Sequence, residues 1–128
     1  MAVIYSTAAK NARLNAVAAT IDAGAGAGVL QIGTTGMATV LATITLADPC
    51  AGAASGGVLT FSGFPRSDTS ADADGTAAAA RIRDSNGNDV ITGLTVGLVG
   101  SGADIIFEST SFNVGEIITL NSATITAN

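Results

Sequence analysis

The stretch GTAAAARIRDSNGNDVITG, residues 75–93, decides the fold of this chain. Two runs of strand-forming residues flank Asn86 and Gly87, a pair that is typical of the turn of a β-hairpin. A type I′ turn places both central residues at positive φ, which Asn and Gly tolerate better than other residues do. Before the turn the residues alternate between two faces, with Ala78, Ala80 and Ile82 on one and Ala79, Arg81 and Arg83 on the other. This period of two predicts a strand with one buried and one exposed face.

Charged residues surround this turn. Asp84 and Asp89 lie close in sequence to the two arginines, so ion pairs within the hairpin are the simpler interpretation. The alternative is that Arg81 and Arg83, which share a strand face, bind carboxylates of a partner. A hairpin is not stable alone in water, so the rest of the chain must supply sheet partners and a facing layer.

The composition limits the classes of function. The 128 residues suffice for one domain, and 25 of them are alanine, so large apolar side chains for a core are few. Ten acidic residues against five basic ones give a net charge of −5, which argues against a nucleic-acid partner. The sequence contains no histidine and only one cysteine, Cys50, so it can form neither a Ser-His-Asp triad nor an internal disulfide.

The N-terminal part of the chain predicts an arm and a helix. We expect residues 1–23 to form this part and residues 24–128 to form a β domain, the two making one structural unit. Ser6 or Thr7 can cap a helix that begins near Ala8. Its apolar residues recur with the spacing of one helical face, namely Leu14, Val17, Ala18 and Ile21. Polar residues interrupt the N-terminus, so we expect no signal peptide, and no run of 18 apolar residues predicts a membrane span.

Short strand patterns recur between turn residues along the β domain. They cover Val29–Thr34, Val40–Leu46, Val58–Phe64, Asp104–Glu108 and, as one strand or two, Glu116–Ala127. Together with the hairpin they amount to about eight strands at fairly even intervals, a pattern typical of a sandwich and not of βαβ units. The sequence therefore predicts a mainly β fold, a single antiparallel β-sandwich that is jelly-roll-like and has a short N-terminal helix.

Three loops contain residue types that hold ligands in other proteins. The glycine-rich segment 22–28 leads into a strand and lacks the Gly-Lys-Ser/Thr ending of a phosphate-binding loop, so we interpret it as a flexible connector. The polar stretch RSDTSADADG, residues 66–75, contains Asp68, Asp72 and Asp74. It is either a solvated loop or a cation site, although the distal glutamate of a calcium loop is missing. Cys50 has no histidine to activate it, so we expect a small buried or half-buried residue there.

The sequence contains few candidate catalytic groups. Glu108 and Glu116 are the two glutamates, and aromatic residues make up 4% of the chain, so a glycosidase-type carboxylate pair in a sugar-stacking cleft is not indicated. We therefore expect a protein that is not an enzyme and that binds no cofactor and no metal.

Several segments follow one another in a recognisable order. AVIYSTAAKNARLNAVAATIDAG, residues 2–24, has a Tyr-Ser-Thr opening, an Asn-Ala-Arg-Leu-Asn-Ala helix and a glycine break. An Asp-Pro loop at 48–53, SGGVLT at 55–60, an Ala-rich strand leading into the hairpin RIRDSNG at 81–87 and a Thr/Ile-rich C-terminal strand follow. This succession covers most of the chain and resembles a family of small tailed-bacteriophage virion proteins of the capsid cement or decoration type.

The resemblance implies a structural virion protein that binds the outer surface of the phage head and stabilises it. Such a protein is made in the host cytoplasm and resides on the capsid surface. Its partners would be the major capsid protein and further copies of itself, in a dimer or trimer, with no nucleic acid and no membrane. The alternative is a phage tail or tail-fibre component or a host-surface binding module. The apolar arm and the basic residues are the expected partner contacts, namely Val3, Ile4, Tyr5, Lys10, Arg13, Arg81 and Arg83.

Overall fold

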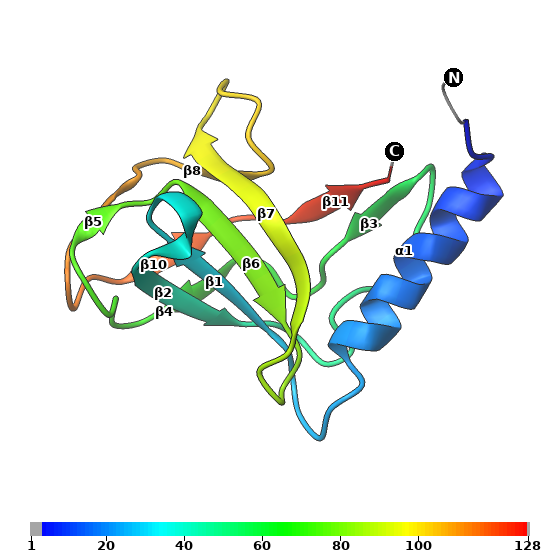
Figure 1. Cartoon of the computed structure of the whole chain (residues 1–128), viewed down its shortest axis with the longest axis horizontal. Helices are drawn as coiled ribbons and strands as arrows, with labels where there is room; N and C mark the ends of the chain where they lie inside the picture. The colour runs from blue at the N-terminus through cyan, green and yellow to red at the C-terminus, as the bar shows by residue number, and fades with distance from the viewer. Residues whose placement is uncertain (1–3, 128) are drawn as a thin grey trace.

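The computed structural model describes residues 4–127 (Figure 1). These residues form one α-helix, α1 (Thr7–Ile21), one 3-10 turn, η1 (Thr35–Met37), and eleven short strands. The strands are β1 (Val29–Gly33), β2 (Val40–Thr45), β3 (Val58–Thr60), β4 (Arg66–Asp68), β5 (Gly75–Thr76), β6 (Ala79–Arg83), β7 (Asp89–Leu98), β8 (Ile105–Phe107), β9 (Ser111–Phe112), β10 (Ile118–Leu120) and β11 (Thr124–Thr126). The predicted mainly β fold with a short N-terminal helix is confirmed. Neither α1 nor η1 has the length and apolar character to cross a membrane, and the described residues contain no other helix.

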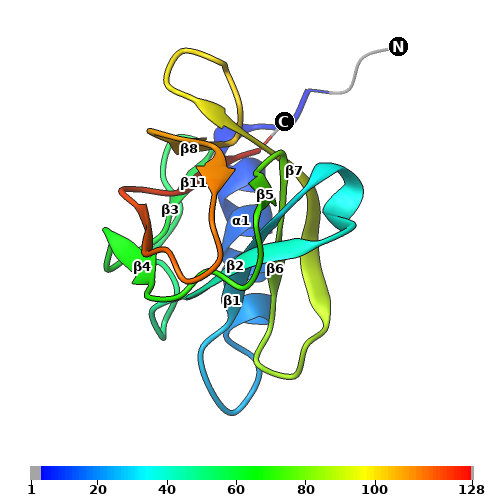
Figure 2. The same cartoon turned by 90° about the vertical axis from the view of Figure 1, so that its left-hand side faces the viewer.

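Five strands form a curled sheet in the order β2-β1-β6-β7-β8 (Figure 2). Neighbouring strands are antiparallel except β7 and β8, which are parallel. The other six strands form three two-stranded ribbons, in which β4 pairs with β10, β3 with β11 and β5 with β9. Because these ribbons are small, the structure matches the predicted sandwich only in its mainly β and largely antiparallel character.

The hairpin predicted around Asn86 and Gly87 joins β6 to β7, but its turn is wider than the predicted type I′ turn. The Gly87 N–H donates to the Asp84 carbonyl at 3.1 Å, and the Asp84 N–H donates to the Asn88 carbonyl at 3.0 Å. Gly87 has a φ of 85°, but Met37 is the one non-glycine residue with positive φ in the described part of the chain. The Asp84 carboxylate explains the difference, because it accepts the backbone N–H groups of Asn86 and Asn88, each at 2.9 Å, and so fixes the wider turn.

One buried cluster links the helix, the curled sheet and the ribbons. Ser6 caps α1, one of the two predicted caps, and its Oγ accepts the Ala9 N–H at 3.1 Å. The cluster contains Leu14, Ala18 and Ile21 of α1 together with strand residues such as Leu30, Ile44, Leu59, Ala80, Ile82, Ile105 and Leu120. The predicted dry face of β6 is confirmed at Ala80 and Ile82, while both arginines on the opposite face are half-buried.

Polar side chains also attach the helix segment to the loop that precedes β3. Three of these side chains accept hydrogen bonds from backbone N–H groups of residues 50–57, and we call this set the helix seam. Its pairs are Asn11 with Gly57 at 2.9 Å, Asn15 with Ala54 at 2.8 Å, and Asp22 with Cys50 at 3.0 Å. The seam therefore satisfies backbone donors of a loop whose residues pack beneath α1.

Two segments differ from their sequence-based interpretation. The polar stretch 66–75 contains a strand, β4, where a loop was expected, because backbone pairing with β10 and a 2.8 Å hydrogen bond between the Ser67 and Thr119 hydroxyls hold it. The glycine-rich connector 22–28 packs against the hairpin turn, where the Gly26 N–H donates to Ser85 Oγ at 3.3 Å. A Cβ at Gly24 would lie 1.7 Å from that oxygen, so a larger residue at this position would force the Ser85 side chain to move.

Candidate partner surface

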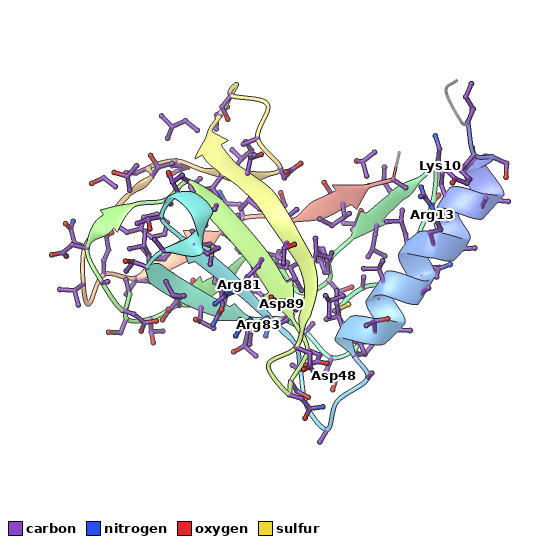
Figure 3. The ribbon with its side chains drawn as sticks, viewed as in Figure 1. Lys10, Arg13, Asp48, Arg81, Arg83 and Asp89 are labelled. Carbon is purple, nitrogen blue, oxygen red and sulfur yellow. The ribbon has the colours of Figure 1, made fainter. Side chains whose placement is uncertain are left out.

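The predicted N-terminal contacts lie on the arm and on the first half of α1 (Figure 3). Val3 lies outside the described residues. Ile4 is 89% exposed and Tyr5 is 45% exposed, so both present apolar surface to solvent. The guanidinium carbon of Arg13 lies 4.6 Å from the centroid of the Tyr5 ring, a cation–π contact that holds these two side chains together. Lys10 is half-buried, with its aliphatic stem close to the loop before β3.

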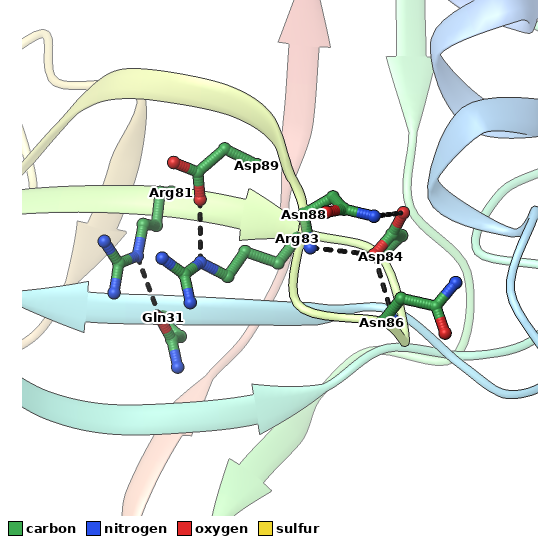
Figure 4. Close-up of polar contacts among 7 residues, drawn as sticks. All are labelled: Gln31, Arg81, Arg83, Asp84, Asn86, Asn88 and Asp89. Carbon is green, nitrogen blue, oxygen red and sulfur yellow. Dashed lines mark hydrogen bonds and ion pairs between the residues drawn. The ribbon is translucent and has the colours of Figure 1, made fainter.

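Arg81 and Arg83 share the polar face of β6, as predicted, but they have different partners (Figure 4). Arg83 Nε donates to Asp89 Oδ1 at 2.7 Å, and this ion pair joins the two strands of the hairpin. Arg81 Nε donates to Gln31 Oε1 of β1 at 2.9 Å. The predicted ion pair within the hairpin is therefore confirmed for Arg83 and Asp89. Of the two acidic residues that the prediction named, Asp89 is the partner of Arg83, while the Asp84 carboxylate accepts hydrogen bonds within the turn.

The turn keeps Asp84 in its charged form. The backbone N–H of Asn88 is the main cause that lowers the pKa of Asp84 from its ordinary value, against the opposing effect of desolvation. The Asn88 side-chain amide, which donates to Asp84 Oδ2 at 3.2 Å, and the Asn86 backbone N–H lower this pKa further. The Asp84 carboxylate therefore binds donors of the turn, while Arg81 binds Gln31 and Arg83 binds Asp89.

The predicted contacts do not gather into one site. Lys10 and Arg13 lie on α1, whereas Arg81 and Arg83 lie on β6 in the middle of the sheet, in a separate part of the molecule (Figure 3). A partner that used all four basic residues would have to span both regions. The structure thus offers two candidate surfaces, the N-terminal segment and the polar face of the hairpin.

Sequence reasoning missed a cavity that brings both glutamates together. Its volume is about 350 Å³, and its lining includes Glu108, Ser111, Phe112, Glu116 and Thr119. The rings of Phe107 and Phe112 meet edge to face beside it, with centroids 5.3 Å apart. Glu108 directly follows β8, and Glu116 precedes β10. Their approach depends on how the ribbons pair, which no spacing in the sequence indicates.

Two of the three aspartates of residues 66–75, Asp68 and Asp74, bind backbone N–H groups of the chain itself. The Asp68 carboxylate accepts the Thr43 N–H at 2.9 Å, and the Asp74 carboxylate accepts the Val114 N–H at 2.6 Å. Within the described residues no group of three or more acidic, cysteine or histidine side chains is arranged to hold a metal ion. These carboxylates therefore attach their loop to β2 and to the segment after β9.

Cys50 is a buried residue, as predicted. Burial, together with the nearby Asp22 carboxylate, raises the pKa of the thiol to about 12. Its Sγ lies 3.8 Å from the Ala18 carbonyl oxygen, to which the thiol donates. A thiol with this pKa is protonated at neutral pH and is a poor nucleophile.

No protein-family model, no curated protein and no solved structure matches this chain. The resemblance to phage virion proteins therefore rests on the sequence segments described above.

Proposed function

We propose that this chain is a structural virion protein, a capsid cement or decoration protein that binds the outer surface of a phage head and stabilises it. The observation that carries the proposal is the ordered succession of sequence segments, from the Tyr-Ser-Thr opening to the hairpin and the Thr/Ile-rich end. In this proposal the protein is not an enzyme and acts only by binding. It is made in the host cytoplasm and resides on the capsid surface.

The N-terminal segment is the proposed contact with the major capsid protein or with a second copy in a dimer or trimer. The exposed Ile4 and Tyr5 support this assignment, because apolar side chains at the end of an arm can be buried in a neighbouring subunit. Arg13, stacked near Tyr5, and Lys10 add positive charge to a chain whose net charge is −5. They suit an acidic partner surface.

The finer fold assignment is part of this proposal. We infer that the curled sheet and the three ribbons together correspond to a jelly-roll-like sandwich in which the ribbons form the second layer. Buried residues of the ribbons, such as Leu59, Phe112 and Leu120, support this view because they share one core with the sheet.

Cryo-electron microscopy of purified virions tests the proposed location. Density for this protein repeated over the whole head at symmetry axes is the expected result. Density confined to the tail would instead support the tail-component alternative, and absence from the particle would reject the virion assignment.

Point variants in the arm test the proposed contact. Deleting the whole N-terminal segment would also remove the Ser6 cap of α1 and could change the fold. The Ile4→Ser/Tyr5→Ser double variant should bind capsids that lack this protein at least about tenfold more weakly, because binding no longer buries two large apolar side chains. Ile117→Ser is the matched control, since Ile117 is 65% exposed at a different loop. Co-sedimentation with capsids measures both, and equal binding of the double variant would contradict the assigned contact.

The cavity with both glutamates favours a host-surface binding module as the second candidate. Its hydroxyl and carboxylate groups can accept and donate hydrogen bonds to a sugar. Glycan-array binding by the wild type that is lost in Glu108→Gln/Glu116→Gln would support this candidate over capsid decoration.

A further inference from the structure

A second, smaller cavity lies on the polar face of the hairpin, beside η1. Its volume is about 240 Å³, and its lining includes Met37, Ala79, Arg81, Asp89, Thr92 and Gly93. It thus combines one arginine, one aspartate and a small apolar floor. Neither the ion pair of the hairpin nor the buried core requires a hollow at this place.

A β-bulge creates this hollow. Ala80 pairs with Leu94 and Ile82 pairs with Ile91, so two residues of β7 face the single residue Arg81 of β6. One of these two residues is Gly93, whose φ of 76° is left-handed and where a Cβ would have no heavy atom within 4 Å, so the lining of the cavity is open at this point. Bulges of this kind redirect side chains and are frequent beside binding sites.

Met37 forms a fixed wall of the cavity. Its φ of 59° lies in the left-handed region, which costs a residue with a Cβ about 1–2 kcal/mol. Its sulfur and terminal methyl lie so close to Gly33 that a Cβ there would be 3.0 Å from each of them. Such strained residues persist where their surroundings fix them, and they are frequent at ligand-binding positions.

The charges around the cavity leave one positive charge uncompensated. Asp89 is paired with Arg83 at 2.7 Å, while Arg81 donates its Nε–H to the neutral Gln31 side chain. Among the described residues no carboxylate forms an ion pair with Arg81. With Nε occupied, the two terminal amino groups of Arg81 keep four N–H donors that match the two oxygens of a carboxylate.

We propose that this cavity binds a single carboxylate through Arg81. A monoanion matches the one uncompensated charge, whereas a phosphate dianion would leave an excess negative charge in a cavity that Asp89 also lines. The volume of about 240 Å³ corresponds to roughly eight water molecules, so the ligand is an acidic side chain or a small free acid. This inference rests on the cavity alone and does not depend on the proposed role at the capsid.

Nuclear magnetic resonance titration of the full chain tests the site. The Arg81 Nε–Hε signal and the backbone amides of Thr92 and Gly93 are followed while butyrate, a blocked Gly-Glu-Gly peptide or inorganic phosphate is added. Sodium chloride keeps the ionic strength constant. The variants are Arg81→Gln and Arg81→Lys, with Arg66→Gln as the matched control at a different strand, and the amide spectrum of each variant reports whether it is folded.

Saturable shifts confined to the cavity are expected for butyrate and the peptide in the wild type and in R66Q. Binding should weaken at least tenfold in R81Q, and also in R81K, because lysine lacks the two-pronged fork. Tighter binding of the peptide than of butyrate assigns the site to a partner's acidic side chain, and equal or weaker peptide binding assigns it to a free acid. Unsaturated shifts, equal shifts in R81Q, or tighter binding of phosphate than of both carboxylates would overturn the proposal.

Discussion

The helix seam and the hairpin turn both use side-chain oxygens to satisfy backbone N–H groups, but they do so over very different sequence distances. In the seam, Asn11, Asn15 and Asp22 bind N–H groups that lie 28–46 residues away. In the turn, Asp84 binds N–H groups two and four residues away. The turn can therefore form from its own sequence, whereas the seam exists only when the tertiary fold brings α1 to the loop.

The two regions also differ in burial. The seam satisfies the N–H groups of Ala54 and Gly57, both of which are buried. The turn satisfies those of Asn86 and Asn88, two exposed residues, although the Asp84 acceptor itself is only 9% exposed, so water reaches these donors more readily than those of the seam. Removing an acceptor should thus be more costly at the seam than at the turn, and each prediction below tests part of this difference.

The largest effect is expected at the seam. In the Asn11→Ala/Asn15→Ala double variant, each orphaned N–H costs roughly 1–3 kcal/mol. The better helix propensity of alanine offsets about 0.5 kcal/mol at each position. The free energy of unfolding should therefore fall by roughly 1–5 kcal/mol, measured by urea denaturation followed by circular dichroism.

The matched control for this experiment is Asn11→Asp/Asn15→Asp. Aspartate keeps an acceptor oxygen at each position, so this variant should retain most of the stability that the alanine variant loses. If both double variants lose the same amount, the hydrogen bonds of the seam are not the source of the effect.

A smaller effect is expected at the turn. Asp84→Ala removes the acceptor for two backbone N–H groups, but solvent reaches these groups, so the melting temperature should fall less than in the seam variant. Asp84→Asn keeps one acceptor oxygen and should fall between wild type and D84A. A fall in D84A as large as that of the seam variant would contradict the distinction between the two regions.

The same distinction explains what the sequence could predict. The hairpin, the dry face at Ala80 and Ile82 and the Ser6 cap depend on residues within a few positions of one another, and all three are confirmed. The turn type was wrong because Asn-Gly favours a two-residue turn, whereas the preceding Asp84 binds the N–H groups of a wider one.

Long-range features could not be predicted in this way. The bond between Asn15 and Ala54 joins two residues 39 positions apart, and nothing in either local sequence indicates it. The cavity beside Arg81 depends on a bulge in β7 and on the placement of η1, and the strand β4 depends on pairing with β10. The sequence predicts that Arg81 lies on the polar face of its strand. It does not predict the cavity beside this residue.

The difference in melting temperature between wild type and D84A should depend on pH through Asp84. Other acidic residues titrate in both proteins, so their effects cancel in this difference. The folded protein lowers the pKa of Asp84, so its contribution is complete above the unfolded pKa of about 3.9 and is lost as the pH falls through the folded value. The difference in melting temperature between wild type and D84A should be constant from about pH 5 to pH 8 and shrink below about pH 4. Thermal unfolding over this range measures it, and a difference that grows in acid would show that the charged form is not the stabilising one.

The smallest effect is expected at the ion pair on the polar face of the hairpin. The Arg83 and Asp89 side chains are 27% and 46% exposed, and pairs at such positions contribute roughly 0–1 kcal/mol. In a double-mutant cycle of Arg83→Gln and Asp89→Asn, the coupling free energy should be about 0.5 kcal/mol and should decrease in 1 M salt, because exposed charges are screened. The contact joins two strands that the turn already holds together. Because both side chains reach solvent, water can solvate each of them when the ion pair is lost. A coupling above about 2 kcal/mol, insensitive to salt, would mean that this face is shielded from solvent, and the hairpin would then resemble the seam in the way it is stabilised.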